Sequence, residues 1–133
     1  MNMKETFLLT EIGRCGRNKE RRALNEYRLI GELLLRFGIG PHLVGFDPLR
    51  ESIRLTAEQD RGFGAAPHAE IIAVAEALCN VTNGEHAIRD AIRAGFSHPD
   101  EIHSQIFPFS EHPTNREFIC TLAELVRDWI HSE

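Results

Sequence analysis

The sequence predicts an all-α protein, a compact bundle of about six helices that contains a helix-turn-helix. Apolar residues recur at intervals of three and four in most segments between the Gly- and Pro-rich breaks, as they do on one face of a helix. No segment alternates convincingly between apolar and polar residues as a half-buried strand would. The length of 133 residues suits one hydrophobic core and is too short for two ordinary domains.

The composition is that of a globular protein, with 42% hydrophobic and 26% charged residues. The formal net charge of −5 argues against broad, non-specific affinity for phosphate backbones, so a DNA-binding surface would need a local basic patch. The longest apolar run is far shorter than the roughly 20 residues of a membrane span. The N-terminus also lacks the features of a secretory leader. We therefore expect a cytoplasmic protein that does not contact membranes.

The residues that commonly carry catalysis or bind metals form no recognisable motif. Cys15, Cys79 and Cys120 lie far apart without a CxxC pair, so we expect reduced, mostly buried thiols. The seven His residues are scattered singly, which fits capping, surface or buried hydrogen-bonded roles better than metal binding. There is no HExxH, P-loop or GxSxG motif. We predict that the protein is not an enzyme and expect no cofactor and no metal.

The positive charge is concentrated near the N-terminus. Residues 1–37 carry eight Lys and Arg against five Asp and Glu, whereas the rest of the chain carries seven against fifteen. Five of the basic residues fall within nine positions next to two glycines: Arg14, Arg17, Lys19, Arg21 and Arg22. We interpret residues 1–22 as a basic N-terminal arm and residues 23–133 as the folded helix-turn-helix domain. A solvated loop that runs into a helix is the alternative interpretation of the basic segment.

The first helix is predicted from Asn18 to Phe37. One face of this segment is apolar: Leu24, Tyr27, Ile30, Leu33, Leu34 and Phe37. Asn18 suits the N-cap, and Gly38 suits the residue after the helix because glycine accepts the left-handed conformation. A Gly- and Pro-rich connector follows.

The second helix is predicted to begin at Asp47-Pro48 and to run to about Glu58. Asp47 can cap the N-terminus of this helix, and Pro48 can take its first helical position.

The third and fourth helices follow a loop that contains Gly and Pro. An Ala-rich segment predicts the third helix from His68 to about Cys79. Thr82 and Glu85 form a T-x-x-E capping box, which predicts that the fourth helix begins at Thr82 and runs to about Phe96.

Two further helices are predicted towards the C-terminus. Ser97 and Pro99 open a short helical turn that runs through Ile106. Thr114 and Glu117 form a second capping box at the start of the last helix. We expect four large side chains of that helix, followed by Ile130, to close the core: Phe118, Leu122, Leu125 and Trp129.

The third and fourth helices have the spacing of a helix-turn-helix, with only Asn80 to Thr82 between them. The fourth helix has an apolar stripe: Ile88, Ala91, Ile92 and Phe96. Its opposite face carries four polar residues: His86, Arg89, Asp90 and Arg93. A recognition helix shows this arrangement, with its apolar side buried and its polar side, Arg89 and Arg93 included, free to enter the major groove. The same spacing also fits an ordinary amphipathic surface helix.

Three blocks of residues, in the same order and with similar spacing, match a known family. The first, residues 39–53 (IGPHLVGFDPLRESI), resembles the family's block G-x-P-x-H-x-x-G followed by LRxAI, with one residue of local variation. The second, residues 85–92 (EHAIRDAI), resembles ERAIRHAI, and the third, residues 113–119 (PTNREFI), is similar to PTNSEFI. On these blocks the chain resembles the C-terminal DNA-binding (effector) domain of the stage-zero sporulation protein A family, the master response regulator of endospore formation.

The resemblance implies a compact helical effector domain whose helix-turn-helix binds promoter boxes in duplex DNA. Its implied function is that of a small transcription regulator. The resemblance leaves three kinds of partner open: further copies in tandem on DNA, a second copy in a homodimer, and a homologous regulator. The similar residues begin almost at the N-terminus and leave no room for the family's phosphoacceptor receiver domain. We therefore expect a stand-alone effector domain, and phosphorylation control is not implied.

The recognition-helix block both keeps and changes family residues. Glu85 and Arg89 keep the residue type found at DNA-contacting positions of the family, whereas His86 replaces Arg and Asp90 replaces His. Both replacements weaken attraction to phosphate, and Arg93, where the family tends to an acid, restores one positive charge. The candidate DNA-binding residues are therefore Glu85, His86, Arg89, Asp90 and Arg93, joined by Arg14, Arg17 and Lys19 as phosphate contacts of the arm.

A second hypothesis is a protein-interaction module, a degenerate copy of the effector fold that binds another regulator or itself and not DNA. The acidity of the chain favours this hypothesis, whereas Arg89, Arg93 and the basic arm favour DNA binding. A positive strip that is continuous from these two arginines to the arm would support DNA binding. An apolar face of mixed charge would support a protein partner.

Overall fold

The fold was analysed in a computed structural model, which describes residues 19–59 and 66–131. These residues form six helices and no strand, so the predicted all-α class is confirmed. The helices are α2 (Lys19–Arg36), α3 (Phe46–Glu58), α4 (His68–Cys79), α5 (Gly84–Phe96), α6 (Glu101–Ile106) and α7 (Asn115–His131). Among the described residues, no helix is at once long enough and apolar enough to cross a bilayer.

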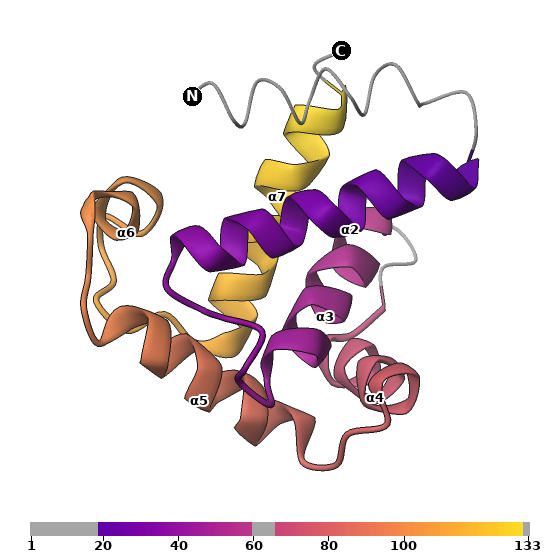
Figure 1. Ribbon diagram of the computed structural model, residues 1–133, viewed down its shortest axis with the longest axis horizontal. Helices are drawn as coiled ribbons and strands as arrows, with labels where there is room; N and C mark the ends of the chain where they lie inside the picture. The colour runs from indigo at the N-terminus through magenta and orange to yellow at the C-terminus, as the bar shows by residue number, and fades with distance from the viewer. Residues whose placement is uncertain (1–18, 60–65, 132–133) are drawn as a thin grey trace.

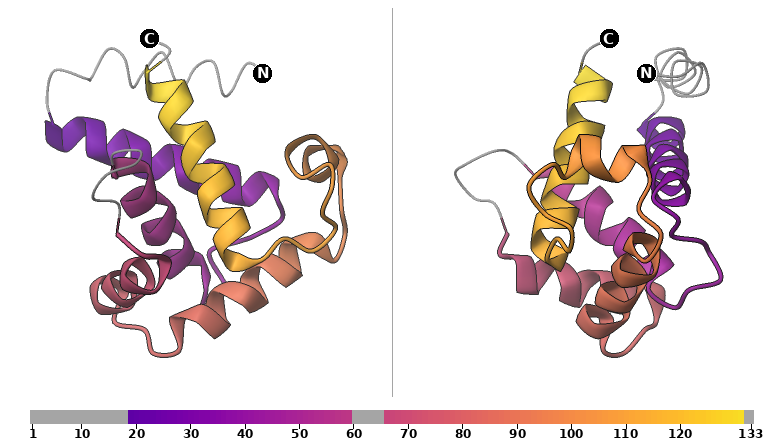
Figure 2. Two further views of the ribbon diagram at one scale, coloured as in Figure 1. Left: turned by 180° about the vertical axis from the view of Figure 1, so that it is seen from behind. Right: turned by 90° about the vertical axis from the view of Figure 1, so that its left-hand side faces the viewer.

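Helix α3 lies at the centre of the bundle, in contact with α2, α4, α5 and α7. The long helix α2 crosses α3 and α7 on one side, and α4 and α5 lie at the opposite end (Figure 1). The two other views show the same separation of α2 from α4 and α5 (Figure 2). The helix-turn-helix therefore forms one end of the molecule.

Four phenylalanines from different parts of the chain form the aromatic centre of the core. Phe37 follows α2, Phe96 ends α5, Phe107 follows α6, and Phe118 lies in the first turn of α7. The ring centroids of all pairs lie 5.4–6.1 Å apart, mostly edge to face, which is the geometry that aromatic pairs prefer. The cluster thereby ties together four segments that are distant in sequence.

His103 lies against this cluster and hydrogen-bonds on both sides of its ring. Its Nε2 lies 3.1 Å from the carbonyl oxygen of Phe37 and 2.9 Å from that of Gly95. Its Nδ1 accepts the backbone N–H of Asp100 at 2.9 Å. Because carbonyl oxygens only accept, this network assigns the proton to Nε2 of a neutral ring. The expectation of a buried, hydrogen-bonded role is confirmed for His103.

Helix α2 agrees with its predicted range but buries a different set of side chains. Leu29 is fully buried, whereas Leu24 is 56% exposed and Tyr27 is half-buried. Leu24 belongs to the predicted apolar face but does not reach the core. It is the sixth residue of α2, and the N-terminal part of α2 projects beyond α3 (Figure 1). Gly38 has φ +83°, as expected for the residue after the helix. Asn18 lies outside the described residues.

Two helices do not begin where the local sequence predicts. Helix α3 begins at Phe46, so Asp47 is its second residue and not its cap; the Asp47 carboxylate instead lies 3.3 Å from Arg50. Helix α6 begins at Glu101 and not near Ser97. There Asp100 and His103 form a reciprocal capping box. The Asp100 side chain accepts the backbone N–H of His103, and the His103 side chain accepts the backbone N–H of Asp100.

The predicted capping box at the start of α5 does not form. The helix begins at Gly84 instead of Thr82, and Asn83 provides no side-chain cap. The backbone N–H of Gly84 is bound instead by Oε2 of Glu76 on α4, at 2.9 Å. The cap therefore comes from the neighbouring helix and could not be seen in the local sequence.

The predicted capping box of α7 does form. Oγ1 of Thr114 accepts the N–H of Glu117 at 3.1 Å, and Oε1 of Glu117 accepts the N–H of Thr114 at 3.4 Å. Because both partners lie within four residues, the local sequence was sufficient to predict it.

The buried face of α7 differs in part from the expected one. Phe118 and Leu122 are fully buried as predicted, but Leu125 and Trp129 are only half-buried at the edge of the core. Ile130 is buried as predicted, and the buried face also includes Ile119, Ala123 and Val126. Helix α7 is therefore rotated slightly from the orientation that its largest side chains suggest.

The cysteines are less buried than expected. Cys79 is half-buried and Cys120 is exposed. Cys15 lies outside the described residues. Burial raises the pKa of the Cys79 thiol above its usual value.

The α2–α3 connector, residues 37–45, is pressed against the backbone of α5. A Cβ atom on Gly45 would overlap the carbonyl oxygen of Ala87. At the other end, a Cβ atom on Gly95 would lie 2.8 Å from the carbonyl oxygen of Phe37 and 2.6 Å from the side chain of Ile39. Glycine is therefore required at both ends of this contact, which sets how closely α5 approaches the rest of the bundle.

We predict that Gly45→Ala destabilises the protein by about 1–3 kcal/mol or more, because the new methyl group would push against the rigid backbone of α5. Urea denaturation followed by circular dichroism measures the change. The matched control is Gly40→Ala, where the methyl group would meet only the exposed side chain of His42, which can rotate away. Equal losses of stability in the two variants would contradict the proposed close contact.

A second prediction compares two aromatic residues of α7. Phe118→Ala should lower the free energy of unfolding by about 3–5 kcal/mol, because its ring is fully buried within the aromatic cluster. Trp129→Ala should cost less, since the indole is only half-buried. Thermal melting of both variants tests this order. A larger loss in Trp129→Ala would show that the indole has a greater share in the core than its exposure indicates.

Candidate nucleic-acid interface

Helices α4 and α5 form the predicted helix-turn-helix. They contact each other and are joined by residues 80–83, one residue more than expected. Asn80 and Asn83 both have φ +54°, a left-handed conformation that Asn tolerates better than most residues. These two positions let the chain turn within four residues and place α5 across the end of the bundle.

Helix α5 presents its two faces as predicted. Its apolar stripe is buried: Ile88, Ala91, Ile92 and Phe96. Its polar face is exposed: His86, Arg89, Asp90 and Arg93. The predictions that Arg89 and Arg93 are exposed, and that residues 68–96 contain no strand, are both confirmed. This helix therefore has the free polar face that a recognition helix needs.

His86 and Asp90, two of the residues that differ from the family pattern on this face, contact each other. Nε2 of His86 lies 3.3 Å from Oδ2 of Asp90, one helical turn away. Both side chains are largely exposed, at 70% and 58%, so the pair contributes little to stability. Its effect is on the surface charge, because a protonated His86 offsets the negative charge of Asp90. Arg89 and Arg93 remain as the permanent positive charges of the polar face.

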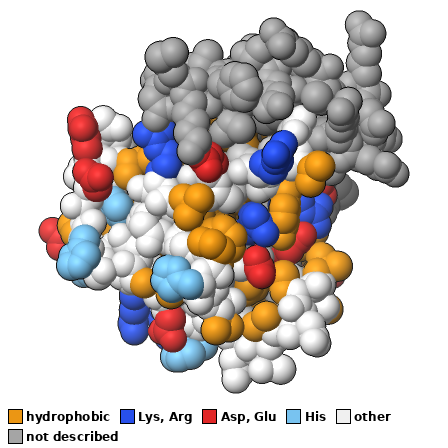
Figure 3. Space-filling view, in the orientation of Figure 1, with side chains coloured by type: hydrophobic (Ala, Val, Ile, Leu, Met, Phe, Trp, Pro, Cys, Tyr) orange, Lys and Arg blue, Asp and Glu red, His pale blue; other side chains and the backbone are white. Residues whose placement is uncertain are grey.

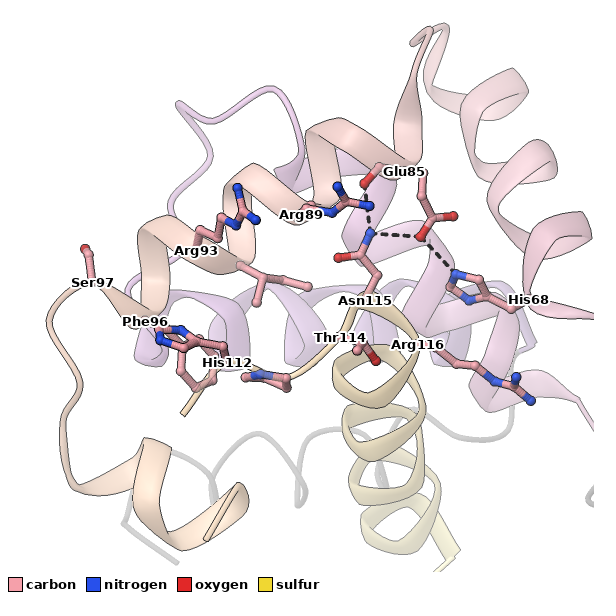
Figure 4. A pocket seen from close by; sticks show the side chains of 12 residues that line it. His68, Glu85, Arg89, Arg93, Phe96, Ser97, His112, Thr114, Asn115 and Arg116 are labelled. Carbon is pink, nitrogen blue, oxygen red and sulfur yellow. Dashed lines mark hydrogen bonds and ion pairs between the residues drawn. The ribbon is translucent and has the colours of Figure 1, made fainter. Parts of the chain in front are cut away.

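Glu85 joins α5 to both α4 and α7. Its carboxylate lies 3.1 Å from Nε2 of His68 and accepts a hydrogen bond from Nδ2 of Asn115 at 2.8 Å (Figure 4). The same Asn115 amide also donates to the backbone carbonyl of Glu85, at 2.8 Å. These contacts fix the first turn of α5.

The Glu85 carboxylate is held in its charged form. Burial raises the pKa of this group, but the hydrogen bonds from His68 and Asn115, together with the nearby positive charges of His68 and Arg89, outweigh the burial and lower the pKa below its usual value. Glu85 therefore has internal partners for its charge. Its role as a direct DNA contact stays a prediction.

An open pocket of about 890 Å³, the α5–α7 pocket, lies between α5 and the start of α7 (Figure 4). Eight of the residues that line it come from these two helices and the cap of α7: Glu85, Arg89, Ile92, Arg93, Phe96, Thr114, Asn115 and Arg116. Of these residues, the sequence placed Glu85, Arg89 and Arg93 in the site. Asn115 and Arg116 belong to the third family block, and their position beside α5 was visible only in the fold.

The basic residues of the N-terminal segment are not placed in the site. Arg14 and Arg17 lie outside the described residues, and the side chain of Lys19 is not described. Lys19 begins α2, at the end of the molecule away from α5 (Figures 1 and 2). The boundary between an arm and a domain at residue 22 stays a prediction, and residues 19–22 belong to α2.

Positive charge is dispersed on the face seen in Figure 3. Among the described residues on this face, Lys and Arg side chains are separated by acidic, His and hydrophobic ones. This face therefore shows no continuous basic strip. The basic cluster that the structure does provide is local, with Arg89, Arg93 and Arg116 around the α5–α7 pocket.

Comparison with known families agrees with this geometry. The family model described as "Sporulation initiation factor Spo0A C terminal" matches residues 30–126, which include the helix-turn-helix and most of α7. Comparisons with curated proteins and with solved structures gave no match. The matching family consists of DNA-binding regulatory domains of sporulation and is not a class of enzymes. Because the match covers most of the sequence, the chain belongs to the Spo0A C-terminal domain family.

Proposed function

We propose that this protein is a small transcription regulator that binds duplex DNA sequence-specifically through α5. The observation that carries the proposal is the exposed polar face of α5, with Arg89 and Arg93 one turn apart on the second helix of a helix-turn-helix. The membership of a DNA-binding family supports the same conclusion.

The residues of α5 have different roles in this proposal. Arg89 lies on the exposed face in the middle of the helix and would read a guanine, since its guanidinium can donate two hydrogen bonds to one base edge. Arg93 and His86 would contact phosphates on either side. Asp90 would weaken the attraction to phosphate, in part offset by its contact with His86. Glu85 would act by holding the first turn of α5 in place.

The charge of the protein suggests how it would bind. With a net charge of −5, one copy has little general attraction to DNA, and few of its side chains would displace counterions. We therefore propose that tandem copies or a homodimer occupy neighbouring promoter boxes, so that two weak contacts act together. Phosphate contacts from Arg14, Arg17 and Lys19 would add affinity without adding sequence preference.

A protein-interaction module is the second candidate function. The observation that favours it is the exposed apolar side of α4, where Leu78 is 59% exposed and Val74 is 43% exposed. A homologous regulator that covers these side chains would remove apolar surface from water. This surface lies on α4 and not on the polar face of α5, so the two functions can be separated by mutation.

We predict that Arg89→Ala lowers the affinity for DNA by about 1–3 kcal/mol and relaxes the sequence preference, because a base-edge contact contributes about that much. The DNA is first selected from a random library by the parent protein, and affinity is then measured by fluorescence anisotropy. Arg28→Ala is the matched control, since Arg28 is an exposed arginine on α2, away from α5. An equal loss in both variants would show only a general charge effect.

We also predict that Asp90→His tightens binding to the same DNA and makes the affinity more sensitive to salt. The change removes a negative charge beside the phosphates and adds a group that can donate to them. Titrations at two salt concentrations measure both effects, with Asp128→His on the exposed side of α7 as the control. If neither the parent nor Asp90→His prefers any duplex over random sequence, and the parent instead binds a homologous regulator, the interaction module is the better account.

A further inference from the structure

We propose that the α5–α7 pocket binds a small organic phosphate with a flat, apolar body, a class whose simplest biological members include nucleoside monophosphates. We also propose that this ligand competes with DNA. The binding site itself is argued from the pocket alone, whereas the competition rests on the function proposed for α5.

The size of the pocket suits a small molecule. Its volume of about 890 Å³ lies within the range of roughly 300–1,000 Å³ that is typical of small-molecule sites. Its walls come from α5 on one side and from the start of α7 and the residues just before it on the other (Figure 4). The hydrogen bonds between Glu85 and Asn115 join these walls at one end, so the pocket is already formed in the folded protein.

The charge of the pocket selects an anion. Arg89, Arg93 and Arg116 all line it, and none of them forms an ion pair with another described residue. Glu85 is the one acidic residue of the lining, and its carboxylate already accepts hydrogen bonds from His68 and Asn115. These three guanidinium groups make the lining positive in a chain of net charge −5, and guanidinium groups match the geometry of phosphate.

The floor of the pocket indicates the rest of the ligand. It is made by Ile92, Phe96 and Pro113, which are all buried in the fold but still line the pocket. A phosphate of the DNA backbone needs only the positive charges and makes no use of an apolar floor. A flat apolar group attached to the phosphate would cover this floor, and arginine side chains can stack on such a group. The combination of positive charges with an apolar floor therefore favours an organic phosphate over a phosphate of the DNA backbone.

Two of the three arginines distinguish this chain from the family pattern. Arg93 stands where the family tends to an acid, and Arg116 stands where the third family block has Ser. Both changes add positive charge, and the fold brings both to the same pocket although they lie on different helices. These two positive charges of the pocket are thus this chain's own departures from the family pattern.

The position of the pocket couples it to the proposed DNA surface. Arg89 and Arg93 belong to the exposed polar face of α5 and also line the pocket. Their guanidinium groups cannot bind a ligand phosphate and DNA at the same time. A ligand in the pocket therefore lowers the affinity for DNA, and by linkage DNA lowers the affinity for the ligand.

Calorimetric titration tests the site with three probes: adenosine monophosphate, adenosine and inorganic phosphate. We expect one molecule of adenosine monophosphate to bind per chain, at least about tenfold more tightly than either of the other two, because only the nucleotide engages both the arginines and the floor. Backbone amides of residues 93–97 and 114–116 should show the largest NMR shifts. If inorganic phosphate binds as tightly as the nucleotide, or if the shifts lie elsewhere, the proposal is wrong.

Two arginine variants make the test specific. Arg116→Ser restores the residue of the family block and should weaken nucleotide binding about three- to tenfold, since it removes one charged contact. Arg28→Ser removes another exposed arginine, on α2, and should leave nucleotide binding unchanged. Equal effects of the two variants would show that the nucleotide responds to overall charge, which would overturn the proposed site.

Titrations with DNA separate the proposed ligand site from the proposed regulator. Saturating adenosine monophosphate should weaken binding to the selected duplex in the parent protein. Nucleotide binding in a protein that binds no DNA would support the pocket and refute the proposed regulator. DNA binding without nucleotide binding would refute the pocket and leave the regulator standing. If both ligands bind but neither affects the other, the competition is refuted.

Discussion

The position of α5 depends on the close contact between its backbone and the α2–α3 connector. Gly45 and Gly95 allow the two backbones to touch at both ends of this contact, where any side chain would hold them apart. His103 then joins the two sides, because its Nε2 lies within hydrogen-bond distance of the carbonyl oxygens of Phe37 and Gly95. The aromatic cluster packs around the same histidine. Since α5 carries the exposed arginines, this contact decides which way the candidate site faces.

The opposite end of α5 is fixed by charge and hydrogen bonds instead of close packing. Glu85 is bound by His68 from α4 and by Asn115 from α7, and the backbone of Gly84 is capped by Glu76 from α4. The helix is thus held at both ends while its polar face stays open. The same arrangement separates α5 from the start of α7 by a pocket, so the proposed DNA surface and the proposed ligand site share one rigid helix.

The sequence by itself determined the features that depend on neighbouring residues. The helical class, the ranges of α4 and α5 to within two residues, and the buried and exposed faces of α5 all follow from local periodicity. The Thr114–Glu117 capping box was predictable because its partners lie within one turn. The three family blocks located the helix-turn-helix and agree with the family match over residues 30–126.

The tertiary structure alone decided the features that depend on residues distant in sequence. Periodicity shows which side of a helix is apolar but not how far a neighbouring helix covers it, so the exposure of Leu24 and Trp129 was not predictable. The partners of Glu85 lie 17 and 30 residues away along the chain. Arg116 likewise becomes part of a site only when α7 packs beside α5. Contacts between elements are set by the packing of the whole bundle, and a local sequence pattern does not contain that information.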